Sequence, residues 1–233
     1  MRDKIPSGNY YFDLWLDGGY EKDVITTFYG PAASGKTNFC LMATAKQAAL
    51  NKKVIFIDTE GGFSVKRLNQ INKNALDKVL LFNVTNFKEQ IEVFNKILSM
   101  ISKKIGLIVV DGIAMQYRLA LSEAARNKEK VRLINSSLVR QLRILSEIAR
   151  KKHIPALVTD QVYSEFLTQE EIEKGKKPGI SLVAGNILKY WSKCIIELQI
   201  EGKKRKAILR KHRSLPEKEF SFMIVEKGIK KVS

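Results

Sequence analysis

The sequence contains little cysteine, no long hydrophobic run and comparatively few acidic residues. Its 233 residues include two cysteines, Cys40 and Cys194, both in apolar surroundings. This excludes a disulfide framework and a cysteine-ligated metal site, and we expect both thiols to be reduced and buried. No apolar run approaches the length of a membrane span, and residues 1–6 lack the apolar segment of a secretory signal. The sequence therefore predicts a soluble, cytoplasmic protein without a membrane partner.

The shortage of acids leaves a strongly basic chain. Lysine and arginine number 41 against 24 aspartates and glutamates, a net charge of +17. Such an excess favours a polyanionic partner, although a lysine-rich solvated surface explains the charge alone equally well. The distribution of charge favours the partner, because seven of the 11 residues from Lys203 to Arg213 are basic. The predicted DNA contacts in this cluster are Lys203, Lys204, Arg205 and Lys206.

One stretch carries an explicit chemical motif. The residues Gly30-Pro31-Ala32-Ala33-Ser34-Gly35-Lys36-Thr37 fit G-x-x-x-x-G-K-[ST], the P-loop that surrounds nucleotide phosphates. The β-branched and aromatic residues 24–29 predict a strand before it, and residues 38–50 predict a helix after it. Lys36 offers a charge to the β- and γ-phosphates, the Thr37 hydroxyl suits Mg²⁺, and the helix start at Asn38 adds partial positive charge. Residues 30–38 are therefore the predicted nucleotide site.

Polar residues follow three other predicted strands at their carboxyl ends. Asp111 follows the apolar run 105–110, as the Mg²⁺-holding acid downstream of a P-loop does. Glu60 follows strand 54–58 and could activate a water, or serve as a helix cap or a solvated loop acid. Gln161 follows strand 155–159 and could contact a γ-phosphate, or cap the strand. Parallel strands place all these positions at one edge of a sheet.

The alternation of strands and helices predicts a single α/β domain over 1–233. Its central sheet should be mostly parallel, with helices on both faces and antiparallel strands at the C-terminal end. Residues 1–23 are expected to be a short lead-in of turns around Leu14 and Leu16. Residues from about 116 to 153 are expected to be helical and heavily basic, and 162–185 a long loop. The apolar residues that can pack this segment on the sheet are Leu133, Leu138, Leu142, Leu145 and Ile148.

The ordered set of motifs resembles a known family. The segments are Ile5-Pro6-Ser7-Gly8, Gly18-Gly19-Tyr20-Glu21, residues 28–38, Asp58-Thr59-Glu60-Gly61-Gly62-Phe63, Asp160-Gln161-Val162 and Leu215-Pro216-Glu217. Together they resemble RecA-type recombinases of the archaeal RadA group, and most closely the short RadB family, which residues 188–193 also resemble. The resemblance implies an archaeal RecA-type P-loop ATPase core that binds ATP and Mg²⁺.

The same resemblance implies roles for individual residues. Glu60 matches the water-activating glutamate, and Gln161 matches the amide that senses the γ-phosphate and links it to the DNA loops. The first DNA loop corresponds to the region of Arg118 to Lys128, which includes Arg126. The second corresponds to 162–185, whose basic residues are Lys174, Lys176 and Lys177. These residues are the further predicted DNA contacts, with single-stranded DNA as the expected form.

Departures from the RadA pattern shape the functional hypothesis. The helical DNA-binding domain that precedes the core in RadA is not expected here, and none of the 11 phenylalanines is followed by alanine three residues later. The stretch 211–214 is basic where RadA-type proteins carry an acid. We therefore expect a nucleoid-associated accessory protein that binds ATP and DNA, hydrolyses ATP weakly, and assists a RadA-type recombinase or another DNA-processing protein. The alternatives are a self-assembling strand-exchange recombinase, and a KaiC-like regulatory ATPase acting on a protein partner.

Overall fold

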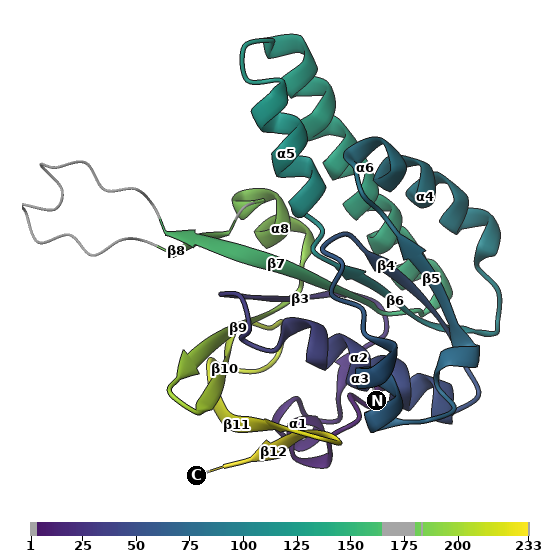
Figure 1. The fold of residues 1–233 in the computed structure, drawn as a ribbon, viewed down its shortest axis with the longest axis vertical. Helices are drawn as coiled ribbons and strands as arrows, with labels where there is room; N and C mark the ends of the chain where they lie inside the picture. Colours follow the sequence, from purple (N-terminus) through teal and green to yellow (C-terminus); the bar gives the residue numbers. More distant parts are fainter. Residues whose placement is uncertain (1–3, 165–179, 183, 233) are drawn as a thin grey trace, which may run out of the picture.

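The computed structural model describes residues 4–164, 180–182 and 184–232, which form strands and helices in alternation (Figure 1). The strands are β1 (Lys4–Ile5), β2 (Tyr20–Glu21), β3 (Ile25–Gly30), β4 (Lys53–Asp58), β5 (Val79–Asn83), β6 (Ile105–Asp111), β7 (Ala156–Ser164), β8 (Ile180–Leu182), β9 (Cys194–Glu201), β10 (Lys204–Lys211), β11 (Glu219–Val225) and β12 (Gly228–Lys231). The helices are α1 (Tyr10–Trp15), α2 (Lys36–Ala49), α3 (Val65–Ile71), the 3₁₀ turn η1 (Leu76–Lys78), α4 (Phe87–Met100), α5 (Met115–Glu123), α6 (Lys128–Lys152) and α8 (Gly185–Trp191). No helix among these ranges is both long and apolar enough to span a membrane.

The large sheet has the predicted mixed character. Its strand order is β12-β11-β10-β9-β3-β7-β6-β4-β5, and β8 pairs with β7. The strands from β9 to β5 are parallel to their neighbours, whereas β10, β11 and β12 continue the sheet antiparallel. The register places Gly30 opposite Gln161, and Asp58 opposite Asp111. The carboxyl ends of the parallel strands therefore bring the predicted site residues to one edge.

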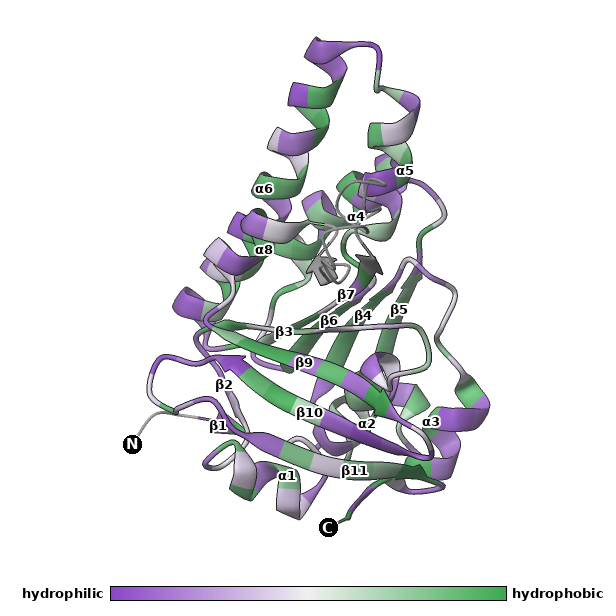
Figure 2. Ribbon diagram, turned by 90° about the vertical axis from the view of Figure 1, so that its left-hand side faces the viewer, coloured by the Kyte–Doolittle hydropathy of each residue, from purple (hydrophilic) through white to green (hydrophobic). Residues whose placement is uncertain are grey.

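Apolar residues on both faces of the strands explain why helices cover both sides of the sheet. In β4, Val54 and Phe56 join the core beneath α2, while Ile55 and Ile57 join the core beneath α4 and α6. Successive side chains of a strand point to opposite faces, so this unbroken apolar run needs cover on each side. Figure 1 shows α4, α5, α6 and α8 on one side and α1, α2 and α3 on the other, and Figure 2 shows the hydrophobic strands between them.

The first residues are more ordered than the predicted lead-in of turns. β1 pairs antiparallel with β2, and the chain between the two strands forms α1. Asn9 caps this helix by accepting a hydrogen bond from the Phe12 amide. Phe12 and Leu16 are buried in the same core as α2, whereas Leu14 is 59% exposed. The helix therefore turns Leu14 away from the core that buries Leu16.

The structure refines the expectations about two further segments. Residues 116–153 are helical as expected but form two helices, because Asn127 caps α6 by accepting a hydrogen bond from the Lys130 amide. Leu133 is 62% exposed and does not pack on the sheet, unlike the four other apolar residues predicted to do so. The predicted loop 162–185 begins and ends in an antiparallel pair, in which Val162 lies opposite Leu182.

Candidate nucleotide site

The P-loop joins the end of β3 to the start of α2, which begins at Lys36, two residues before the predicted helix. Gly35 has φ +105°, a left-handed conformation that favours glycine. Gly30 is required for a different reason, since a Cβ there would lie 2.3 Å from the carbonyl oxygen of Leu198 on β9. The loop is therefore shaped both by its own backbone angles and by the neighbouring strand.

A cavity of about 240 Å³ adjoins this loop. Its lining residues are Ala32, Ala33, Gly35, Lys36, Thr37, Glu60, Gln161 and Ile224. Lys36 supplies a cation to this cavity, and the first amides of α2, which begins at Lys36, have no partner within the helix. Such amides and a cation are the groups that bind phosphate at a helix start. The residues thus fit a nucleotide phosphate.

The Lys36 ammonium is held over the loop. Its Nζ donates hydrogen bonds to the carbonyl oxygens of Gly30 and Pro31, both at 2.9 Å. Burial lowers the pKa of Lys36, while Glu60, Asp111 and Asp160 act in the opposite direction by stabilising the charged form. The charge is therefore placed inside a ring of main-chain atoms, where a triphosphate would meet it with little competing water.

The predicted magnesium ligands are in direct contact. The Thr37 hydroxyl donates to Asp111 Oδ2 at 2.7 Å, and the hydroxyl of Thr159 donates to Asp111 Oδ1 at 2.6 Å. Burial raises the pKa of Asp111, and these two hydrogen bonds oppose that rise. One hydroxyl and one carboxylate next to a phosphate site match the few protein ligands that Mg²⁺ takes when it also binds phosphate. Among the described residues there is no cluster of three or more metal-binding side chains, so the phosphates would have to complete the coordination.

Glu60 and Gln161 also meet at this edge, as predicted. Gln161 Nε2 donates to Glu60 Oε2 at 2.9 Å. The turn that carries Glu60 is ordered by the carboxylate of Asp58, which accepts hydrogen bonds from the amides of Glu60, Gly62 and Phe63 at 3.2, 3.1 and 2.8 Å. The carboxylate expected to activate water and the amide expected to sense phosphate therefore form one hydrogen-bonded pair beside the P-loop.

Sequence comparison agrees with this geometry. A family model described as Rad51 matches residues 3–232. The chain belongs to the Rad51 family. The DNA repair and recombination protein RadB of Methanocaldococcus jannaschii is 38% identical over 218 residues, covering 92% of this chain and 96% of that relative. The RadB of Methanobrevibacter smithii is 38% identical over 236 residues, covering 97% of this chain and 95% of that protein.

Comparison with solved structures gives the same result. A crystal structure of the RadB recombinase matches with a TM-score of 0.77 and 34% identity, covering 97% of this chain and 99% of that one. The resemblance to RecA-type recombinases and the RecA-type fold expected from the sequence are therefore confirmed. The Rad51-family fold is a nucleotide-binding fold, as the P-loop indicated.

The basic residues predicted to contact DNA in this Rad51-family chain do not gather into one patch. The turn between α5 and α6, which carries Arg126, lies far from the β9–β10 hairpin in both ribbon views (Figures 1 and 2). Arg118 and Arg126 are exposed, and so are Lys203 and Lys204. The remaining predicted contacts, Lys174, Lys176 and Lys177, lie outside the described residues.

Lys206 and Arg205 of the basic hairpin are engaged within the protein. Lys206 forms ion pairs with Glu201 at 2.9 Å and Glu219 at 3.1 Å, which offset its charge and make it a poor phosphate contact. Arg205 Nε donates to the carbonyl oxygen of Ala33 at 3.2 Å. The hairpin therefore touches the P-loop itself, a contact that the sequence did not reveal.

The structure also reassigns or adds several residues. The side chain of Asn38 turns away from the loop, because its Oδ1 accepts hydrogen bonds from Arg67 at 3.0 and 2.7 Å, so its main-chain N–H is the group that can face a phosphate. Thr159 and Ile224 were missed. Thr159 directly precedes Asp160 and Gln161 in the sequence, and Ile224 reaches the site from the antiparallel strand β11.

Proposed function

We propose that this chain binds ATP with Mg²⁺ at the P-loop, binds DNA through the β9–β10 hairpin, and assists a RadA-type recombinase in homologous recombination and DNA repair. The observation that carries the proposal is the joint placement of three groups at one sheet edge. These are the Thr37–Asp111 pair, the Glu60–Gln161 pair and the hairpin residue Arg205 against the P-loop. Membership of the Rad51 family, whose relatives include DNA repair and recombination proteins, supports the same conclusion.

In this proposal the residues at the sheet edge have separate roles in binding and hydrolysing ATP. Lys36 and the loop amides hold the β- and γ-phosphates, and Thr37 with Asp111 holds Mg²⁺. The ion, when bound, neutralises charge that develops on the transferring phosphate. Glu60 accepts a proton from the attacking water, and Gln161 loses or keeps its bond to Glu60 according to whether a γ-phosphate is present.

We expect hydrolysis to be slow. Of the described residues that line the phosphate cavity, Lys36 is the one that carries a positive charge. Related enzymes place a second cation on the transferring phosphate, often from a neighbouring subunit, and such a group is worth roughly 10³–10⁵ in rate. Turnover by the purified chain should therefore be slow and insensitive to DNA, and fast DNA-stimulated hydrolysis would contradict the proposal.

The test is a DNA-binding titration with and without ATP and Mg²⁺, repeated over a range of salt concentrations. The variant Lys203→Glu/Lys204→Glu reverses two exposed charges of the hairpin. Lys88→Glu/Lys96→Glu makes the same charge change on exposed positions of α4 and is the control. If two phosphate contacts are lost, the slope of log K against log salt for single-stranded DNA should fall in magnitude by about 1.4 in the hairpin variant alone.

Two outcomes would refute parts of the proposal. Equal slopes for the two variants would show that the hairpin does not bind DNA. Calorimetry that detects no ATP uptake with Mg²⁺ present would remove the nucleotide site. Light scattering in the same samples addresses the strand-exchange alternative, which requires assembly in the presence of ATP and DNA.

A further inference from the structure

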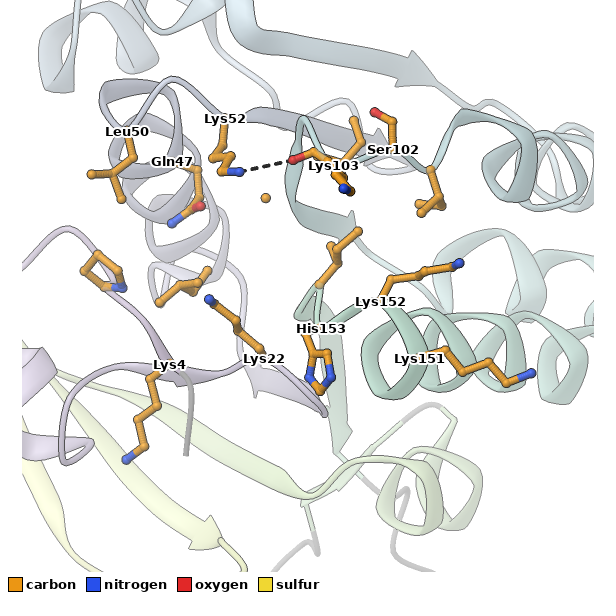
Figure 3. Close-up of a pocket in the computed structure, with 16 residues that line it drawn as sticks. Lys4, Lys22, Gln47, Leu50, Lys52, Ser102, Lys103, Lys151, Lys152 and His153 are labelled. Carbon is orange, nitrogen blue, oxygen red and sulfur yellow. Dashed lines mark hydrogen bonds between the residues drawn. The ribbon is translucent and has the colours of Figure 1, made fainter. Parts of the chain in front are cut away.

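A second cavity lies at the opposite end of α2 from the P-loop, where α2 and α6 end and β6 begins (Figure 3). Its volume is about 780 Å³, larger than the phosphate cavity. The lining residues are Lys4, Ile5, Pro6, Lys22, Gln47, Leu50, Lys52, Ile101, Ser102, Lys103, Ile105, Gly106, Lys151, Lys152, His153 and Ile154. We call this the basal pocket. None of its residues belongs to the nucleotide site.

The basal pocket combines positive charge with apolar walls. Six of its 16 lining residues are lysines, and none of the described ones carries a carboxylate. Lys4 and Lys151 are balanced by Asp17 at 3.1 Å and Glu147 at 2.6 Å just outside the pocket. The remaining charge is therefore concentrated on other lysines of the rim.

Three of those lysines face solvent. Lys52, Lys103 and Lys152 are exposed, and Lys52 Nζ donates to the carbonyl oxygen of Lys103 at 3.1 Å. Six apolar side chains line the same cavity: Ile5, Pro6, Leu50, Ile101, Ile105 and Ile154. The chemistry suits a ligand that carries anions beside apolar groups.

A buried amide provides an independent sign of a binding site. Gln47 is 2% exposed, and its Nε2 has no hydrogen-bond partner among the described residues. Figure 3 places this amide between Leu50 and Lys52. Its Oε1 lies against Gly106, where an added Cβ would approach it to 2.5 Å. A buried donor without a partner costs free energy that an anionic ligand would recover.

We propose that the basal pocket binds an acidic, apolar peptide segment of a partner protein, with a carboxylate accepting from Gln47 Nε2 and from the rim lysines. DNA fits the pocket less well. Its described residues include no arginine to fork onto phosphate and no phenylalanine, tyrosine or tryptophan to stack on a base. A duplex is also too wide to reach a buried amide, whereas an extended peptide presents alternating side chains to a pocket.

The probe is a C-amidated heptapeptide of alternating leucine and glutamate that carries fluorescein on its N-terminal amine. Two matched peptides replace every glutamate by glutamine, or every leucine by glycine. Binding to the full chain is followed by fluorescence anisotropy and by the side-chain amide resonances of Gln47, which Gln47→Leu assigns by their loss. The pocket variant is Lys103→Glu/Lys152→Glu.

The control for the pocket variant is Lys130→Glu/Arg132→Glu. These two residues are exposed near the start of α6, about 30–33 Å along that helix from Lys152. Each ion pair lost between an exposed lysine and a peptide carboxylate should weaken binding about fivefold, and loss of the buried Gln47 donor at least about tenfold. We therefore expect about 25-fold weaker binding by the pocket variant, at least about tenfold by Gln47→Leu, and less than about twofold by the control.

The outcomes separate this inference from the proposed function. Support requires that the leucine–glutamate peptide moves the Gln47 resonances and binds at least about fivefold more tightly than either matched peptide. The inference is overturned if those resonances do not move, if the pocket and control variants bind equally, or if a 12-nucleotide single strand moves them and displaces the peptide. ATP binding and hairpin-dependent DNA binding are measured on the same variants. They test the proposed function separately, because neither uses a residue of the basal pocket.

Discussion

Replacing Thr159 by valine tests how the magnesium site is built. Thr159 is fully buried on β7, and its hydroxyl donates to Asp111 Oδ1 at 2.6 Å while accepting from the Gly112 amide at 2.7 Å. Valine keeps the shape but removes both hydrogen bonds. The unpaired amide should cost about 1–3 kcal/mol, and the lost bond to a carboxylate about 1.5–3 kcal/mol. We expect the free energy of unfolding to fall by about 3–5 kcal/mol.

The same change should weaken nucleotide binding through Asp111. The hydrogen bonds from Thr159 and Thr37 oppose the burial that raises the pKa of Asp111, so removing one raises that pKa further. A larger fraction of Asp111 is then protonated at any given pH and cannot hold Mg²⁺. Loss of a group that orients a metal ligand typically costs about 10–100-fold in affinity, and the loss should be greater at pH 6 than at pH 8.

The assay has two readouts and one matched control. Urea unfolding followed by circular dichroism measures stability, and titration with a fluorescent ATP analogue, with and without Mg²⁺, measures binding. Thr159→Ser keeps the hydroxyl and should retain most of the Mg²⁺ dependence. If the valine variant matches wild type in both stability and Mg²⁺-dependent binding, Thr159 does not support Asp111 and the reasoning is wrong.

Three other substitutions test separate parts of the structure. Burial raises the pKa of Asp160 from its ordinary value of 3.8 to about 7. The stability that this group contributes is full below about pH 4 and is lost as pH rises from about 4 to 7. Over that range wild type should lose about 1.4 kcal/mol per pH unit in urea unfolding, and Asp160→Asn should lack that slope. In the wild-type structure the Arg213 guanidinium lies 3.0 Å from the buried Glu21 carboxylate. Arg213→Gln removes this cation and should lower the free energy of unfolding by about 3 kcal/mol, and the double variant with Glu21→Gln should recover most of that loss. Gly30→Ala places a Cβ 2.3 Å from the Leu198 oxygen and should cost about 1–3 kcal/mol by thermal unfolding, whereas an unchanged Tm would show that β9 moves aside freely.

The features that the sequence predicted correctly depend on local patterns. The P-loop motif lies within eight residues, and its flanking strand and helix follow from short-range apolar spacing. The pairing of Glu60 with Gln161 was also within reach, because strand ends in a parallel sheet share an edge. A motif and a topology rule are enough for such residues, since neither needs the identity of a distant partner.

The features that were missed depend on contacts between distant segments. Lys206 reads as a phosphate contact until Glu201 and Glu219 are placed beside it by strand pairing. The helical sequence pattern continues on both sides of Asn127, but the chain forms two helices because the Asn127 side chain caps the second one. Arg205 reaches Ala33 across 172 positions in the chain. Composition and periodicity carry no information on such pairs, because they arise from tertiary packing.

Helix α2 connects the two sites that we infer. Lys36 lies in its first turn beside the phosphate cavity, and Gln47 lies in its last turn beside the basal pocket, about 16 Å along the axis. Eleven of its fourteen residues are buried, so phosphate binding cannot shift one end without moving a packed core. A rigid helix of this kind holds both sites in fixed relation but offers no second arrangement for a ligand to select. The structure therefore favours a protein that holds a nucleotide and a partner peptide at once, with peptide affinity independent of nucleotide, over one that exchanges them.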